Sequence, residues 1–382
     1  MLQLQLPLSA ALLFRDVNLL ITTDVHSWLA GHAHPDHTPR LDADFGDIVS
    51  FVERVRTAAD AQGRDVFLLD NGDIVDGTAL SESKPDLLRL LATMPYQALN
   101  CGNHELYKDD TITSLLAPLP GTNTSSFIEH WNGTYITSNI NFAGKPLGGA
   151  RFAVLRGKHG TRLLVLGFLY DMPDHAPSVT VTAVADAVRQ PWWRQAMGRL
   201  AEVDAVVVLA HMHYVDPLVT TILDAIRAAS RTVPVQFVTG HSHIRAFARL
   251  DAHAASFEAG NYANTLGFAS FDLARGASTT AFAHEFVDMD TAALATAAGL
   301  PSPRALPTAD GEALSTSIAA TRAALGATRE LGCASRTYEV GEPLDRPNSL
   351  WGVYMREVVG PWRRLNEKPL FVSRRNERTT DE

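Results

Sequence analysis

Short apolar runs alternate with segments of helical periodicity through the first two thirds of the chain. Ile48, Phe51, Val52 and Val55 recur at the spacing of one helix face, and they follow a continuous apolar run at residues 17–23. The same alternation of strand and helix then repeats. The further predicted strands are 66–69, 96–100, 205–209 and 235–238, and the further predicted helices contain 87–91, 192–200 and 218–229.

Strand patterns are the more frequent kind in the later part of the chain, up to residue 287. Residues 151–157 and 161–169 alternate around a turn at 158–160, which predicts a hairpin. Three more strands are predicted in meander order at 255–260, 266–274 and 279–287. The predicted class is therefore α/β (α+β): a four-layer sandwich in which helices flank two mixed β-sheets.

The composition changes near residue 291, where Ala, Pro and Thr become frequent. This change predicts a domain at 12–290, a linker at 291–313 and a partial C-terminal appendage at 314–382, with a helix at 314–331. About ninety residues after the domain are too few for a second catalytic unit.

The overall composition narrows the class of protein. The chain has 382 residues, 46% of them hydrophobic, and a formal net charge of −9, which predicts a soluble globular protein without nucleic acid as its partner. Only Cys101 and Cys333 occur, so a disulfide framework is excluded. No apolar run reaches the roughly 18 residues of a transmembrane segment.

The compartment and the oligomeric state stay open. Residues 1–14 lack the basic start and the cleavage site of a clear signal peptide. The sequons at Asn123 and Asn132 have meaning only in the secretory route. A secretory or vacuolar lumen remains an alternative if the N-terminus is incomplete.

Candidate metal ligands and neighbouring candidate site residues follow five of the predicted strands. Because functional groups gather just past strand C-termini in α/β folds, these residues are expected to meet. The candidates are Asp24, His26, Asp73, Asn103, His104, His211, His213, His241 and His243. They offer nitrogen and oxygen atoms and no thiolate, which suits Mn, Zn or Fe. Seven or eight such ligands are what two ions require if one carboxylate bridges them.

Two alternatives accompany this set. His211 and His213 are near neighbours, and the position at the strand end favours His211 as the ligand. Residues 32–37 match H-x-H-x-D-H, the metal motif of metallo-β-lactamase-type hydrolases. This second motif lies in a loop that contains Gly and Pro, after a strand that D-x-H already uses, so it is the weaker candidate.

The ordered motifs D-x-H, G-D-x-x-x-G, G-N-H-E, H and G-H-x-H resemble the calcineurin-like metallophosphoesterase superfamily, in particular its 5′-nucleotidase-related branch, over residues 17–290. The resemblance implies a fold of the metallophosphatase type and two divalent ions. One ion would be held by Asp24, His26, Asp73 and His243, and the other by Asp73, Asn103, His211 and His241. Asn103, His104 and His213 would contact a small phosphorylated substrate, with His104 as the catalytic acid or electrostatic stabiliser and a metal-bridging hydroxide as nucleophile.

Three positions depart from the pattern of the 5′-nucleotidases. Tyr107 stands where they carry the Asp that orients the catalytic histidine, and Asp109 or Asp110 is a candidate substitute. Asp76 stands where purple acid phosphatases carry a ligand tyrosine. The C-terminal segment resembles only the opening elements of their nucleoside-binding domain, at residues 349–359.

These observations predict a metal-dependent phosphoester hydrolase. Phosphomonoesterase activity, including the 5′-nucleotidase type, is the first hypothesis. A phosphodiesterase on the same centre and a catalytically weak metal-binding scaffold protein are the alternatives. Glu105 is predicted to support its loop, and Cys101 to be a small buried residue rather than a nucleophile.

Overall fold

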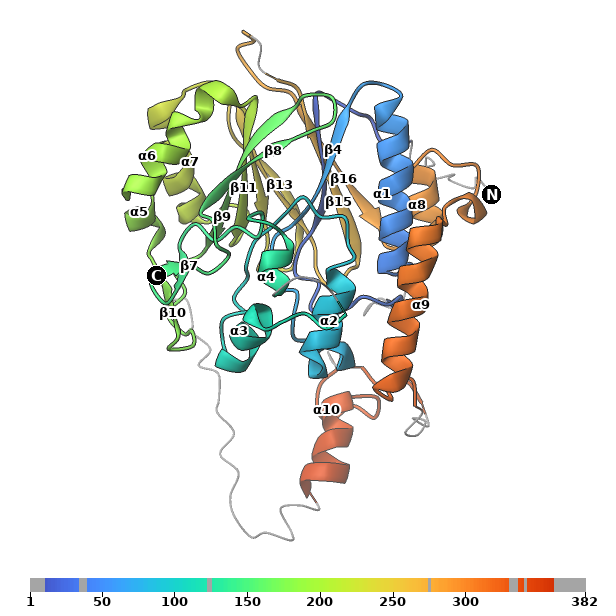
Figure 1. Cartoon of the computed structure of the whole chain (residues 1–382). Coiled ribbons are helices and arrows are strands. Elements are labelled where there is room, and N and C mark those ends of the chain that lie inside the picture. Colours follow the sequence, from blue (N-terminus) through green and yellow to red (C-terminus); the bar gives the residue numbers. More distant parts are fainter. Residues whose placement is uncertain are drawn as a thin grey trace, which may run out of the picture. The chain divides into compact units, whose positions relative to one another are not determined.

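The computed structural model describes residues 11–33, 40–121, 126–273, 276–329, 336–339 and 342–360. Two mixed β-sheets form the centre of the fold, as predicted, and helices cover their outer faces (Figure 1). The main strands are β1 (Val17–Thr22), β4 (Asp65–Asp70), β5 (Ala98–Leu99), β8 (Phe152–Arg156), β9 (Arg162–Leu169), β11 (Ala205–His211), β12 (Val235–Thr239), β13 (Arg245–Asp251), β14 (Ala254–Ala259), β15 (Thr265–Phe271) and β16 (Phe282–Asp288). The main helices are α1 (Phe45–Asp60), α2 (Lys84–Leu91), α3 (Asp109–Leu116), α6 (Pro191–Gly198), α7 (Pro217–Ala229), α8 (Thr291–Ala297) and α9 (Ala309–Ala324).

The first sheet has the strand order β16-β15-β1-β4-β5. Strands β1, β4 and β5 run parallel, whereas β15 and β16 are antiparallel to their neighbours. Side chains alternate across β1: Leu20 faces the helices, and Leu19 and Ile21 face the second sheet. The sheet is therefore buried on both faces, which explains why its strands appear as continuous apolar runs.

The second sheet has the order β13-β14-β12-β11-β9-β8. Its central strands are parallel, and the predicted hairpin of β8 and β9 is confirmed as an antiparallel pair. Val207, Leu209 and Phe257 of this sheet pack with Phe67 and Leu69 of β4. This contact between the two sheets forms the middle layer of the core.

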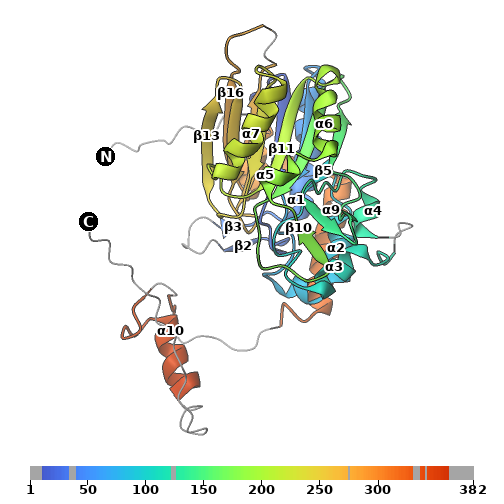
Figure 2. The ribbon, with the colours of Figure 1, turned by 90° about the vertical axis from the view of Figure 1, so that its left-hand side faces the viewer.

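Helices complete the outer layers. Phe51 and Val52 of α1, with Leu294 of α8 and Ile318 of α9, pack against the outer face of the first sheet. Figure 2, viewed from the side of α5 (Val184–Ala187), α6 and α7, shows these helices in front of the second sheet. Ile222 of α7 lies in their shared apolar cluster. The predicted four-layer arrangement is thus confirmed.

One predicted connection is wrong. The three strands at 255–260, 266–274 and 279–287 do not form a meander, because β14 lies in the second sheet whereas β15 and β16 lie in the first. β14 pairs with β12 and with β13, a strand that was not predicted. Alternating apolar positions show that a segment is a strand, but they do not show which sheet accepts it.

The segment 291–313, predicted as a linker, contains α8 and a short 3₁₀ helix at Pro303–Ala305. The first compact unit extends to Ala327. The reason is that Leu294, Leu306 and Leu314 are buried in the core next to the first sheet. The helix predicted at 314–331 is α9, which begins and ends earlier than predicted. The division of the chain into a domain, a linker and an appendage stays a prediction.

A second unit comprises Thr328–Glu382, and its described part contains α10 (Leu350–Val353) followed by a π-helical segment at Tyr354–Val359. Among the described residues of both units, no helix is long and apolar enough to cross a membrane.

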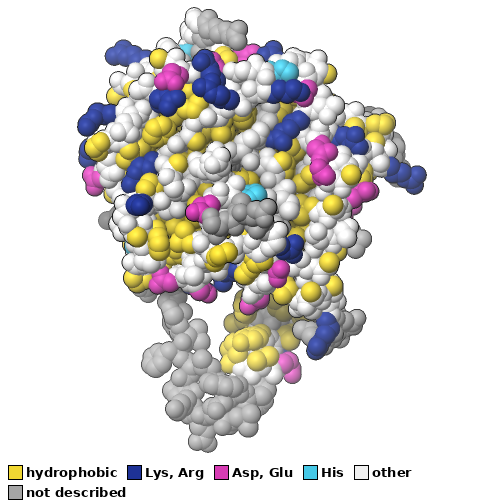
Figure 3. Space-filling model, in the orientation of Figure 1, with side chains coloured by type: hydrophobic (Ala, Val, Ile, Leu, Met, Phe, Trp, Pro, Cys, Tyr) yellow, Lys and Arg dark blue, Asp and Glu magenta, His cyan; other side chains and the backbone are white. Residues whose placement is uncertain are grey.

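Charged side chains of both signs lie on the face of the molecule in Figure 3. On the face in Figure 3, the described Lys and Arg side chains lie apart from one another, with Asp and Glu side chains among them. This face offers no continuous basic surface among its described residues. The expectation that nucleic acid is not a partner stays a prediction.

Candidate metal centre

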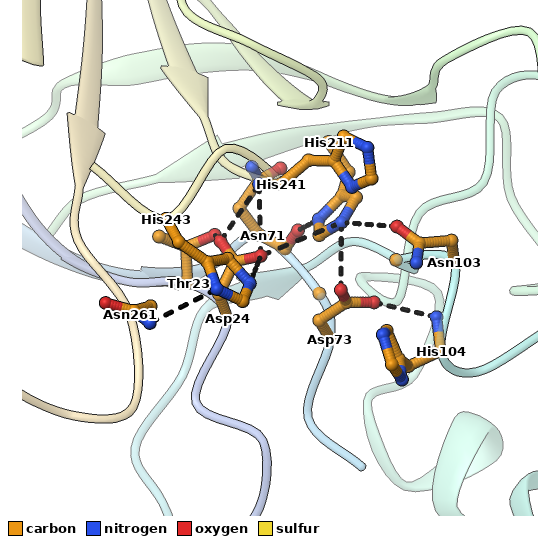
Figure 4. A network of polar contacts seen from close by, with 12 residues as sticks. Thr23, Asp24, Asn71, Asp73, Asn103, His104, His211, His241, His243 and Asn261 are labelled. Atoms are coloured by element: carbon orange, nitrogen blue, oxygen red, sulfur yellow. Dashed lines mark hydrogen bonds and ion pairs between the residues drawn. The ribbon is translucent and has the colours of Figure 1, made fainter. Parts of the chain in front are cut away.

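Polar side chains from both sheets meet at one edge of the sandwich. Asp24 follows β1, Asp73 follows β4, and His211 is the last residue of β11. Because the strands that carry these residues run parallel within each sheet, their carboxyl ends lie at the same edge. Figure 4 shows the side chains of Asp24, Asp73, Asn103, His211, His241 and His243 pointing toward one another.

Two groups of potential ligands share one carboxylate. The first group is Asp24, His26, Asp73 and His243, and the second is Asp73, His211 and His241. Within each group the ligand atoms lie within 4.8 Å of one another. The side chain of Asp73 is buried, and its Oδ2 lies 3.6 Å from His26 Nε2 and 3.2 Å from His211 Nε2. Asp73 is therefore common to both groups.

The first group gathers imidazole nitrogen and carboxylate oxygen atoms around one point. His26 Nδ1 lies 3.1 Å from the carbonyl oxygen of Val75 and 2.9 Å from that of Asp76. Carbonyl oxygens only accept, so Nδ1 carries the proton and the neutral ring presents a lone pair at Nε2. This Nε2 lies 3.2 Å from His243 Nε2, and Asp24 Oδ1 lies 3.4 Å from the same His243 atom. A metal ion between these atoms would satisfy all of them.

The second group gathers oxygen atoms around one imidazole nitrogen. His211 Nδ1 donates to the carbonyl oxygen of Asn71 at 2.9 Å, which directs Nε2 into the centre. Asn103 Oδ1 lies 3.0 Å from this Nε2, and Asp24 Oδ1 lies 3.8 Å from it. Asn103 thus lies beside the second group, and its role as a ligand stays a prediction. Histidine nitrogen with carboxylate and amide oxygen suits Mn, Zn or Fe.

Several ligand positions require unusual backbone geometry. Asp24, His26, Asp73, His241 and His243 all have positive φ values, between 44° and 74°. Each such residue costs on the order of 1 kcal/mol or more, and strain of this kind concentrates at functional sites. Neighbouring glycines permit the close packing: a Cβ on Gly102 would lie 2.2 Å from Asp73 Oδ1.

Glu105 supports two of the loops, which confirms the predicted role. Its buried carboxylate accepts hydrogen bonds from the backbone N–H groups of Asp73, Ile74, Val75 and Gly102, at 2.8–3.2 Å. The loop that carries Asp73 is thereby tied to the loop that carries Asn103. Burial, followed by the charge of Asp73, raises the pKa of Glu105 to about 7.

His104 lies beside the ligands and not among them. Its backbone N–H donates to Asp73 Oδ1 at 2.8 Å, and its Nδ1 lies 3.0 Å from Asp76 Oδ2. The candidate substitutes Asp109 and Asp110 do not hold it; Asp110 instead pairs with Lys84. Sequence reasoning missed Asp76 as the partner, although its position three residues after Asp73 was the available signal.

His211 and Asp73 shift each other's pKa values strongly. Burial lowers the pKa of His211, but Asp73 and Asp24 outweigh burial and raise it to about 10. Burial would raise the pKa of Asp73, but the charge of His211 outweighs it and holds that pKa well below its ordinary value. The two residues form an ion pair, and a metal ion that binds His211 would displace this proton.

The remaining candidates lie outside the two ligand groups found among the described residues. His213 Nδ1 accepts from the backbone N–H of Val215 at 3.4 Å, so its contact with substrate stays a prediction. In the rival motif, the ring of His32 packs against Trp28 at 4.6 Å, and residues 34–37 lie outside the described part of the chain. Cys101 is buried and free, as predicted.

The two-sheet sandwich and its histidine–carboxylate edge together define the metallophosphoesterase class. The profile of the calcineurin-like phosphoesterase family matches residues 17–245, and the chain belongs to this family. A 5′-nucleotidase from Candida albicans SC5314 is 25% identical with a TM-score of 0.81, covering 92% of this chain and 66% of that one. A 5′-nucleotidase precursor from Thermus thermophilus shares the fold, at 18% identity, a TM-score of 0.53, and coverage of 81% and 59%.

Curated relatives are longer than this chain. An uncharacterised protein of Schizosaccharomyces pombe is 35% identical over 266 residues, covering 67% of this chain and 42% of its own length. An uncharacterised protein of Saccharomyces cerevisiae is 30% identical over 365 residues, covering 90% and 59%. A protein of Arthroderma benhamiae named as secreted is 31% identical over 267 residues, covering 66% and 38%. The chain thus spans about 40–60% of the length of these relatives.

Proposed function

We propose that the chain is a hydrolase of small phosphomonoesters that uses two divalent metal ions. The observation that carries this proposal is the pair of ligand groups that share Asp73. Asp24, His26, Asp73 and His243 would hold one ion, and Asp73, Asn103, His211 and His241 the other. When bound, the ions would supply Lewis-acid stabilisation of the phosphoryl oxygens and activate a water molecule.

His104 supplies the proton chemistry in this proposal. Its Nδ1–H donates to Asp76, and this contact sets the direction of the ring. The opposite nitrogen, Nε2, then donates a proton or a hydrogen bond to the leaving oxygen. About one third of the His104 side chain is exposed, so substrate can reach it without a rearrangement of the core.

Nucleoside 5′-monophosphates are the substrate class to test first. The support is the similarity to the 5′-nucleotidase of Candida albicans, which covers 92% of this chain. The Asp76–His104 contact also bears on the alternative of a weak scaffold, because that alternative depended on the absence of an orienting carboxylate.

A hydrolysis panel tests the proposal. The full chain is freed of metal, supplied with Mn, Zn or Fe(II), and assayed with AMP, p-nitrophenyl phosphate, its bis ester and a phosphopeptide. We expect turnover of monoesters that depends on added metal and disappears in Asp73→Asn. Asp224→Asn, which changes an exposed aspartate on α7, is the matched control and should retain full turnover.

Three results would contradict the proposal. Metal binding without turnover of any ester would favour the scaffold alternative, and preference for the bis ester would favour a phosphodiesterase. Metal content unchanged by Asp73→Asn would show that the ions bind elsewhere.

A further inference from the structure

Tyr107 occupies the position at which related 5′-nucleotidases would carry an aspartate, and the proposed function leaves it without a role. It lies on the surface beside the centre, 42% exposed, four residues after Asn103. Its ring lies edge-on to His104, with the ring centroids 5.2 Å apart. Its phenol oxygen accepts a hydrogen bond from Asn103 Nδ2 at 3.0 Å.

The Asn103 amide has two chemically different ends. Its Oδ1 lies 3.0 Å from His211 Nε2, inside the second ligand group, and its Nδ2 points away toward Tyr107. Figure 4 shows the amide oxygen on the side of His211. Only the oxygen end can bind a cation, because an amide NH₂ group is a donor without an available lone pair. The orientation of this amide therefore decides whether the second group is complete.

We infer that Tyr107 is the positioning residue for Asn103, and that it holds the amide with Oδ1 toward the second metal position. This inference rests on the proposed two-metal function. The other side of the second group is already set by the backbone, since His211 Nδ1 donates to the Asn71 carbonyl. Asn103 has no such backbone support for its NH₂ group among its described contacts; the phenol supplies it. In this chain, therefore, Asp76 orients the histidine and Tyr107 orients the asparagine.

The test measures metal binding separately from activity. The metal-free full-length chain is titrated with Mn²⁺ alone, and the free ion is followed by its electron paramagnetic resonance signal. We expect two bound ions in the wild type. In Tyr107→Phe, which keeps the ring, the first ion should bind unchanged and the second about tenfold more weakly, the lower end of what loss of a hydrogen bond to a metal ligand typically produces.

A matched control and a second background make the test specific. Tyr214→Phe removes a phenol oxygen from a half-buried ring after β11 and should change neither affinity. In Asn103→Asp, both ends of the side chain are oxygen atoms, so orientation no longer matters. Adding Tyr107→Phe to Asn103→Asp should then change the affinity for the second Mn²⁺ ion by less than twofold.

The outcomes separate the inference from the proposed function. Fewer than two bound Mn²⁺ ions in the wild type would overturn the two-metal function itself. If the wild type binds two ions, and Tyr107→Phe binds both with the wild-type affinities, only the role of Tyr107 is overturned. The same tenfold loss in the wild-type background and in the Asn103→Asp background would also overturn it, because Tyr107 would then act through the loop as a whole.

Discussion

Replacement of Asp76 by asparagine tests whether the proposed acid is oriented from the loop after β4. The change removes the charge from the partner of His104 and preserves its size. Asp76 Oδ2 lies 3.0 Å from His104 Nδ1, and the two side chains are 36% and 33% exposed. The Asp76→Asn side chain would still offer an amide oxygen, so the ring would lose the charged partner and keep a neutral one.

The structure sets the expected magnitude. A hydrogen bond to a charged group contributes about 1.5–3 kcal/mol. Because both side chains are about one third exposed, solvent screening places the effect at the lower end, about 1.5 kcal/mol. A change of this size in the transition state corresponds to about a tenfold loss in kcat/KM.

The assay compares leaving groups. Esters of poorly acidic phenols need protonation of the leaving oxygen, whereas p-nitrophenolate leaves almost unaided. Asp76→Asn should therefore lower kcat/KM about tenfold for phenyl phosphate and less than threefold for p-nitrophenyl phosphate. Metal stoichiometry should remain at two, because Asp76 is in neither ligand group.

The control addresses the alternative that the sequence left open. Asp110→Asn alters the aspartate that pairs with Lys84, and it should leave both substrates unaffected. The reasoning would be refuted if Asp110→Asn, and not Asp76→Asn, showed the leaving-group dependence. Equal losses for both esters in Asp76→Asn would mean that this residue supports the loop rather than the acid.

Two further predictions concern stability. Glu105→Gln replaces one of two oxygens that each accept two buried N–H groups, so thermal unfolding should show a loss of about 2–4 kcal/mol, whereas Glu129→Gln on the surface should show none. Burial, then nearby aspartates, raises the pKa of Asp47 to about 6, so the folded state binds its proton more tightly than the unfolded state and stability falls as the pH rises from about 4 to about 6. From urea unfolding curves, we expect the free energy of unfolding of the wild type to fall by on the order of 1 kcal/mol over that range, a value reduced to allow for the partial exposure of Asp47. In Asp47→Asn this fall should be absent. An unchanged pH dependence in the variant would contradict the assignment.

The ligand types and the main core were predictable from local sequence. Continuous apolar runs identified β1, β4, β11 and β12, because strands buried on both faces have no polar positions to alternate with. Parallel strands end at a common edge, so residues after those runs were expected to meet, and they do. The chemistry of the centre was therefore contained in residue types and their order.

The partners of those residues could not be predicted in the same way. The strand β14 carries an ordinary alternating pattern, and its place in the second sheet depends on pairing with β12 and β13. Segment 291–313 appeared to be a linker from composition, although its few leucines are enough to bury it against the first sheet. Both findings have one cause: whether a segment is buried depends on what another part of the chain presents to it.

By itself, then, the sequence determined a two-sheet fold with oxygen and nitrogen ligands at one edge. The tertiary structure decided that Asp76 holds His104, that Glu105 ties two loops, and that Tyr107 faces the Asn103 amide. The first two of these contacts join residues of loops after different strands, where a shift of about 1 Å exchanges one partner for another. Spacing along the chain does not encode distances that small, because they result from how separate loops pack together.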